Sequence, residues 1–193
     1  EFKISDLNSI KKEEKAHNIK NLEVKENISF IKDTYLQYNR IDPNKRFDNF
    51  LTGLSNKLAY EASLKVSENI SHYNPLYIYG GVGMGKTHLL NAIGLEVRNS
   101  KKVMFISAER FMYHFVRSIK NNEMVKFKDF FRGPNVFIID DIQFANGKEA
   151  MQEEFFHTFN ALIERGSQII ISSDRPPANL DRIQERIRSR MSG

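Results

Sequence analysis

The chain has 193 residues, 40% of them hydrophobic, which is enough for one sizeable buried core. It contains no cysteine, so disulfide bonds and cysteine-ligated zinc or iron–sulfur sites are excluded, as is usual in a reducing compartment. No run approaches the roughly 18 apolar residues of a membrane span, and the N-terminus has no apolar signal core, so we expect a cytoplasmic protein. The net charge of +5 is compatible with a nucleic-acid partner and equally with an ordinary protein surface.

The N-terminal segment, residues 1–42, differs in composition from the remainder. It alternates charged residues freely, has neither Gly nor Pro, and its few apolar residues are only weakly periodic. We expect a linker or tether that is largely disordered or weakly helical, with residues 30–38 able to dock on the domain. Asp42-Pro43 marks the boundary, and residues 43–193 form the folded domain.

Residues 46–56 lead into a predicted helix over residues 57–70. Phe47 and Phe50 are three apart, and Asn56 is a suitable helix cap. Two interpretations remain open: a packed lead-in segment, or a segment that wraps the base of a bound nucleotide.

The next stretch carries the strongest signal in the chain. An apolar strand over residues 75–79 runs into Gly80-Gly-Val-Gly-Met-Gly-Lys-Thr87, and an apolar-periodic helix follows. This is the P-loop pattern, whose glycines let backbone N–H groups curl around a phosphate. Lys86 is expected to reach the β- and γ-phosphates and Thr87 to offer its hydroxyl to Mg²⁺. The predicted nucleotide-binding residues of this stretch are Gly81, Val82, Gly83, Met84, Gly85, Lys86, Thr87 and His88. A glycine-rich turn without a ligand is the alternative, which the flanking strand and helix disfavour.

A second buried strand is predicted over residues 102–107. The following stretch, residues 108–131, is longer than one crossover helix needs. It has one apolar face with Phe111, Phe115, Val116 and Ile119, and another after Asn121-Asn122, so we expect two helices decorated by basic residues.

The third strand, residues 135–141, is an apolar run that ends in Asp140 and Asp141. Such runs are typical of parallel strands buried on both faces, and ligands collect at their carboxyl ends. In a P-loop protein two acids there indicate Mg²⁺ and an attacking water. We assign Asp140 to the metal and Asp141 to orienting or deprotonating the water, with helix-capping acids as the alternative.

The last third predicts a helix over residues 147–165, a fourth strand over 168–173 and an amphipathic helix over 180–191. Ser173 or Asp174 is expected beside the γ-phosphate, unless this is only a strand-end turn. The final helix is rich in arginine, which stabilises phosphoryl-transfer charge and could act on a neighbouring subunit's nucleotide. A solvated basic face is the alternative. The five histidines are scattered, and we interpret them as ordinary surface or packing residues.

With these residues in place, the chain from about Phe47 to Arg190 resembles the ATPase domain of the DnaA family of bacterial replication initiators, in the AAA+ class. The resemblance rests on residues 47–56, 73–90, 139–144, 152–160 and 173–175. It implies an α/β P-loop NTPase, a three-layer sandwich with a mainly parallel sheet of order 5-1-4-3-2. From the resemblance we expect strand five and the helical lid to lie outside this chain, with the domain incomplete at its C-terminus.

The resemblance also implies roles for individual residues. Phe47 and Asn56 would line the adenine side, and Asp174 would be the first sensor. Arg190 would be the arginine finger presented to the ATP of the next protomer, with Arg186 beside it. The insertion over residues 108–131 would help wedge protomers into a filament. Met112 and Lys148 would touch single-stranded DNA, although Ala150 replaces a residue that is often basic or polar in the family.

These features predict an ATP-binding, Mg²⁺-dependent initiator of chromosomal replication that self-associates at the origin and resets by slow ATP hydrolysis to ADP. Asp141 is one methylene shorter than the Glu of fast AAA+ motors, which is why we expect slow turnover. We expect origin duplex binding to need a C-terminal domain that is not part of this sequence, and we expect the replicative helicase machinery as the protein partner. The alternatives are a DnaA-like regulator or helicase loader that acts through protein partners, and a P-loop kinase for a small metabolite.

Overall fold

The structure is a computed structural model that describes residues 41–70 and 72–192. The predicted linker lies almost entirely outside these residues. The described residues all belong to one compact unit. Within it, no helix is long and apolar enough to cross a membrane.

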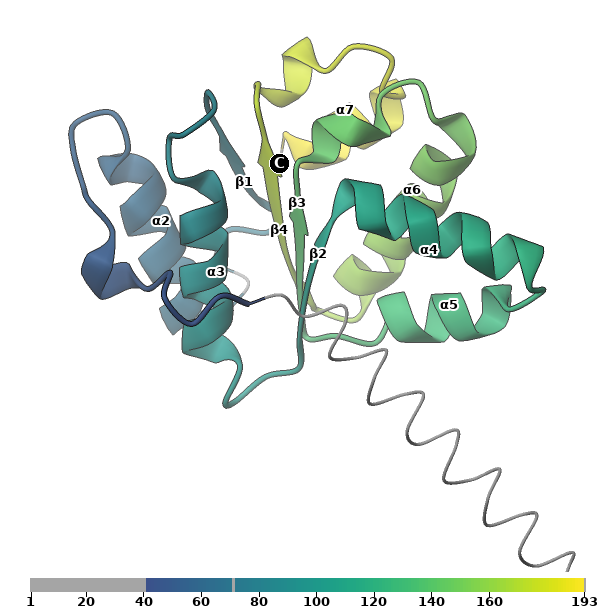
Figure 1. The fold of residues 1–193 in the computed structure, drawn as a ribbon, viewed down its shortest axis with the longest axis horizontal. Coiled ribbons are helices and arrows are strands. Elements are labelled where there is room, and N and C mark those ends of the chain that lie inside the picture. Colours follow the sequence, from purple (N-terminus) through teal and green to yellow (C-terminus); the bar gives the residue numbers. More distant parts are fainter. Residues whose placement is uncertain (1–40, 71, 193) are drawn as a thin grey trace, which may run out of the picture. The chain divides into compact units, whose positions relative to one another are not determined.

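A four-stranded parallel sheet forms the centre of this unit (Figure 1). Its strands are β1 (Leu76–Tyr79), β2 (Val103–Ser107), β3 (Val136–Asp140) and β4 (Gln168–Ser173), in the order β1-β4-β3-β2. This confirms all four predicted strands and the order expected from the resemblance, and the described residues contain no fifth strand. Because the strands are parallel, all four carboxyl ends lie at one edge of the sheet, where ligands are bound in such folds.

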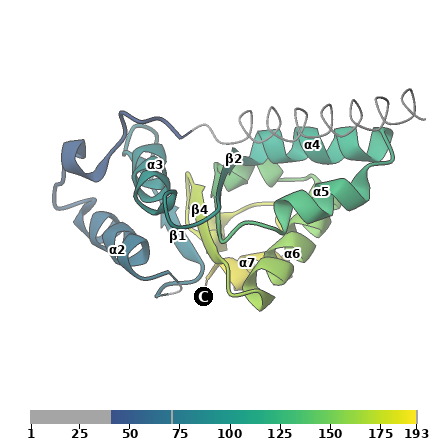
Figure 2. The same ribbon diagram turned by 90° about the horizontal axis from the view of Figure 1, so that it is seen from below.

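Helices cover both faces, so the expected three-layer sandwich is present (Figures 1 and 2). On one face lie α2 (Lys57–Glu68) and α3 (Lys86–Val97). On the other lie α4 (Ala108–Lys120), α5 (Met124–Phe131) and α6 (Glu149–Glu164). The alternation of side chains along β3 serves both layers: Val136 and Ile138 join the core under α2 and α3, whereas Phe137 packs against Phe111 of α4.

The core under α3 is tightly packed. Leu90 and Ile93 of α3 and Ile138 and Ile170 of the sheet are all fully buried. Burial of each such side chain stabilises the fold by about 1.5–3 kcal/mol relative to exposure. This packing fixes α3, and with it the loop that precedes α3, against the sheet.

The insertion consists of two helices, as predicted, but its apolar face is different. Phe111 and Phe115 are buried, whereas Val116 and Ile119 are exposed, which corrects the predicted face. His114 is buried in their place, because the i, i+3, i+4 positions of Phe111 include residue 114 and exclude 116. Burial, and then the nearby Arg110 and Arg117, lower the pKa of His114 from 6.5 to about 4.

The chain after β4 departs most from prediction. Instead of one helix over residues 180–191, a short 3-10 helix η3 (Pro177–Asn179) precedes α7 (Glu185–Met191). Arg182 lies between them with a left-handed φ of 52°, which no helix continues through. The buried Gln152 of α6 explains this: its Nε2 donates to Arg182 O at 2.8 Å and its Oε1 accepts from Gln184 N–H at 3.0 Å. These bonds hold the backbone in an irregular path.

Candidate nucleotide-binding site

The glycine-rich loop lies between the carboxyl end of β1 and the start of α3. Gly83 and Gly85 have φ values of 80° and 86°, a conformation that side chains rarely adopt. At Gly85 a Cβ atom would also lie 2.7 Å from Cε2 of Phe50. Backbone conformation and space therefore both require glycine here. The helix that follows begins at Lys86, so its free N–H groups face the loop.

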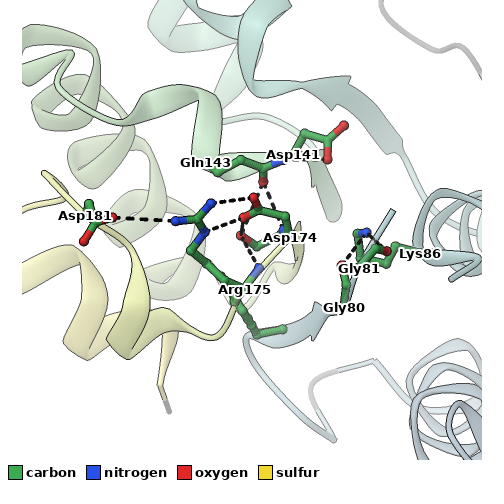
Figure 3. Close-up of polar contacts among 10 residues, drawn as sticks. Gly80, Gly81, Lys86, Asp141, Gln143, Asp174, Arg175 and Asp181 are labelled. Carbon is green, nitrogen blue, oxygen red and sulfur yellow. Dashed lines mark hydrogen bonds and ion pairs between the residues drawn. The ribbon is translucent and has the colours of Figure 1, made fainter. Parts of the chain in front are cut away.

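Lys86 folds back over this loop. Its Nζ donates to Gly80 O at 2.7 Å and to Gly81 O at 2.8 Å (Figure 3). The ammonium group is thereby held inside the loop curve, where the backbone donors converge. An anion such as a phosphate is the ligand that this arrangement of positive groups favours.

Thr87 at the start of α3 and Asp140 at the end of β3 are in contact although they are 53 residues apart. The Thr87 hydroxyl donates to Asp140 Oδ2 at 2.8 Å. Alternation along β3 puts Asp140 on the same face as Ile138, which is the face that α3 covers. In the described chain no three His, Cys, Asp or Glu residues form a metal cluster. A hydroxyl and a single carboxylate beside a phosphate loop are nevertheless the donor set that suits Mg²⁺ held partly by a nucleotide.

Ser172 of β4 bonds to both Asp140 and Asp141. Its hydroxyl donates to Asp140 Oδ1 and accepts the backbone N–H of Asp141, the latter at 2.9 Å. Asp141 itself has a left-handed φ of 57°. Such a conformation in a non-glycine residue is strained, and the bond to Ser172 helps to maintain it.

Asp174 follows β4 directly and lies at the same edge of the sheet. Arg175 binds it with two bonds, Nε to Oδ1 at 2.9 Å and Nη2 to Oδ2 at 2.8 Å (Figure 3). The guanidinium lowers the pKa of Asp174, and Arg175 also pairs with Asp181 at 3.6 Å. The Tyr77 hydroxyl donates to Arg175 O at 3.0 Å, and burial raises the pKa of Tyr77 to about 12. Arg175 therefore holds Asp174 as a carboxylate at the carboxyl edge of the sheet.

The segment before α2 covers one side of the loop. His88 Nε2 contacts Arg46 O at 2.8 Å and Asn49 Oδ1 at 3.0 Å, and its ring meets Phe50 edge to face. These contacts join the segment to the P-loop helix, so His88 is a packing residue of the site. Phe47 instead packs on Tyr60 of α2.

Three predicted residues lie apart from these contacts. The Asn56 side chain bonds within its own segment, accepting from Gly53 N–H at 2.7 Å and donating to Leu51 O at 3.1 Å. Met112 lies half-buried on α4, and the half-buried Lys148 directly precedes α6. Both of these helices cover the sheet face opposite α3.

The arginines of α7 are not equivalent. Arg186 stacks on Phe156 at 4.6 Å and pairs with Glu153, and Arg188 pairs with Glu185. Arg190 is exposed and has no ion-pair partner in the described part of the chain. It is thus the α7 arginine with a guanidinium available to a second molecule.

Residues 41–193 match the family described as "Bacterial DnaA ATPase domain". The chain belongs to this family. Over 160 residues it is 50% identical to the chromosomal replication initiator protein DnaA of Rickettsia canadensis, covering 80% of this chain and 35% of that protein. The chain therefore spans about a third of the length of the curated relatives it matches.

Solved structures of the DnaA family agree with this assignment. Domain III of DnaA from Thermotoga maritima is 43% identical with a TM-score of 0.77, over 79% of this chain and 65% of that one. A replication initiator DnaA bound to AMPPCP and single-stranded DNA is 41% identical with a TM-score of 0.78, over 80% and 49%. These likenesses confirm the AAA+ fold and favour the initiator interpretation over a metabolite kinase.

Sequence reasoning missed three polar residues of this DnaA-family site: Gln143, Ser172 and Arg175. Gln143 interrupts the apolar residues that follow the predicted acids, and Ser172 ends the apolar run of β4, and both are detectable signals. Their roles depend on contacts between β3 and β4, and spacing alone does not reveal such contacts.

Proposed function

We propose that this chain is the ATP-binding and ATP-hydrolysing part of a bacterial replication initiator, in which bound ATP switches on self-association at the origin. The observation that carries the proposal is the Thr87–Asp140 pair, 2.8 Å apart, beside a loop that gathers backbone donors and Lys86. Membership of the DnaA ATPase domain family supports it. A relative of the same fold is described as bound to AMPPCP, an ATP analogue.

The residues divide the chemistry among themselves. The loop N–H groups and Lys86 hold the phosphates, and Phe47, Phe50 and His88 close the base side. Thr87 and Asp140 would hold Mg²⁺, which would supply positive charge beside the phosphate oxygens. Asp141 would orient the attacking water and accept its proton, and Asp174, paired with Arg175, would lie near the γ-phosphate as a sensor. The products are ADP and inorganic phosphate.

We expect this hydrolysis to be slow. The carboxylate of Asp141 is carried on a side chain one methylene shorter than glutamate, so it reaches less far toward the water. Slow turnover suits a switch that must persist while an assembly forms. Single-turnover measurement of hydrolysis by the chain tests this expectation, and a rate in the usual enzyme range of about 1–1,000 per second would contradict it.

The decisive test of nucleotide binding is Lys86→Ala. Loss of charge-assisted bonds to phosphate costs about 1.5–3 kcal/mol, or roughly a 10- to 100-fold weaker affinity for ATP. Lys101→Ala is the matched control, because Lys101 is an exposed lysine away from the loop. Equal ATP affinity of Lys86→Ala and the parent chain, measured by titration calorimetry, would contradict the proposal that this loop binds ATP.

Self-association is proposed to use Arg190 in trans. Its exposure and lack of an ion-pair partner within the described residues support this role. Arg190→Ala should keep ATP affinity and lose ATP-dependent assembly, measured by light scattering. Loss of ATP affinity in this variant would instead place Arg190 in its own site.

Single-stranded DNA is proposed to bind through the insertion over residues 108–131, with Met112 and Lys148 as contacts. The supporting observation is the 41% identical DnaA whose structure is described as bound to single-stranded DNA. Binding of a fluorescent oligonucleotide in the presence of ATP should weaken in Met112→Ala and in Lys148→Ala. Unchanged anisotropy curves in both variants would remove these two residues from the proposal. We assign binding of origin duplex DNA and contacts with the helicase to parts of the longer relatives that lie outside the matched region.

A further inference from the structure

One glutamine joins the ends of β3 and β4. Gln143 lies in the 3-10 helix η2 (Ile142–Ala145), which follows the two acids. Its Nε2 donates to Asp141 Oδ1 at 2.9 Å, and its Oε1 accepts from Asp174 N–H and from the Ser173 hydroxyl, both at 3.3 Å (Figure 3). A single amide group thus bonds the proposed water-orienting acid on one side and the proposed sensor segment on the other.

Chemistry decides which way this amide points. The Asp141 carboxylate accepts hydrogen bonds and cannot donate, so it requires the NH₂ end of Gln143. The backbone N–H of Asp174 only donates, so it requires the oxygen end. Both requirements are met in one orientation, and neither is met after the amide is turned over.

The Asp141 main chain and side chain are fixed by different partners. Its strained backbone, with φ of 57°, is held by the bond from its N–H to Ser172. Its carboxylate receives one hydrogen bond in the described part of the chain, from Gln143 to Oδ1. The second oxygen, Oδ2, is left for another donor such as water. Without Gln143 the carboxylate can rotate about its own side-chain bonds.

We propose that Gln143 is a positioning residue for ATP hydrolysis, which sets the plane of the Asp141 carboxylate relative to the end of β4. This inference rests on the proposed function. The donor end orients Asp141 for the water, and the acceptor end ties that orientation to the Asp174 backbone. An error of about 1 Å in such an arrangement can reduce a rate about 100-fold, so an orienting bond has a measurable effect.

The competing role is purely structural: Gln143 could do no more than stabilise the η2 turn. Gln143→Glu separates the two roles because it keeps the shape and leaves an acceptor for Ser173 and Asp174. It replaces only the donor, so a carboxylate then faces the carboxylate of Asp141. Like charges in contact repel, and an asparagine at 141 removes that repulsion by supplying a donor.

The first experiment measures thermal unfolding of the nucleotide-free chain. Gln143→Glu should lower the unfolding midpoint, and adding Asp141→Asn should restore most of the loss. Gln152→Glu is the matched control: its NH₂ group donates to the Ala145 and Arg182 carbonyls, so Asp141→Asn should not rescue it. Additive effects of Gln143→Glu and Asp141→Asn would overturn the proposed contact.

The second experiment measures ATP affinity and single-turnover hydrolysis of the same chain. Gln143→Glu should hydrolyse ATP at least about tenfold more slowly, while its ATP affinity stays within about threefold of the parent. An unchanged rate, or an affinity that falls as much as the rate, overturns the positioning role. The unfolding experiment on the nucleotide-free chain tests the contact between Gln143 and Asp141 whether or not the chain hydrolyses ATP. By contrast, an unaffected Lys86→Ala variant counts against the proposed function alone.

Discussion

The two halves of the nucleotide site are built in different ways. The phosphate loop, residues 80–88, is continuous in sequence and presents mainly backbone groups, with Lys86 bonded to carbonyls five and six residues away. The other half is assembled from side chains on two strands, with partners such as Asp141 and Ser172 separated by 31 residues. The first half therefore depends on backbone conformation, and the second depends on the register between β3 and β4.

Gly85→Ala is expected to reduce ATP affinity most, because it changes the half of the site that depends on backbone conformation. The left-handed conformation at Gly85 costs an alanine about 1–2 kcal/mol, and its Cβ would also meet the Phe50 ring. ATP binding, measured by calorimetry, should be lost or reduced more than in Lys86→Ala.

Gly166→Ala is the matched control for this change. Gly166 has a φ of 72°, and no atom lies within 4 Å of the place that an added Cβ would take, so the alanine meets the same backbone strain without the clash. It should lose stability and keep ATP affinity. Equal ATP affinity of the two variants would show that the loop tolerates distortion.

Asp140→Asn changes the half of the site that is assembled from two strands. Its effect should be smaller than that of Gly85→Ala and confined to the Mg²⁺ dependence of ATP affinity. The asparagine can still accept from Ser172, so the fold is kept, but the charge that would attract Mg²⁺ is removed. The gain in ATP affinity on adding Mg²⁺ should shrink by about tenfold, which corresponds to about 1.4 kcal/mol. Asp129→Asn, an exposed acid on α5, is the control, and a Mg²⁺ effect equal in both variants would contradict the assignment.

The smallest effect should come from a residue outside both halves. His114 has its pKa lowered from 6.5 to about 4 by burial, so the unfolded chain binds more protons between these values. Stability is then fully present above pH 6.5 and decreases as the pH falls toward 4, with a loss of about 2 kcal/mol by pH 5. Denaturant unfolding should show this slope, and His114→Phe should flatten it without changing ATP affinity. An unchanged slope would mean that His114 is not its source.

Much of the fold could be predicted from the sequence because the signals were local. The apolar runs ending in Ser107, Asp140 and Ser173 gave three strands within about one residue, and the glycine pattern gave the β1–α3 unit. The C-terminal helix was predicted too long because its apparent periodicity includes Ile183. This residue is buried, but it is held in an irregular segment by bonds to Gln152.

By itself, then, the sequence determined the phosphate loop, the pair of acids at the end of β3 and the family, since each depends on contiguous residues whose conformation follows from their own chemistry. Tertiary structure alone decided that Thr87 meets Asp140, that Ser172 joins the two acids, and that Gln143 spans β3 and β4. The physical reason is that these bonds depend on strand order and register. The resemblance indicates the order, but the register is fixed by burial of apolar faces across the whole sheet, and no local pattern in the chain specifies it.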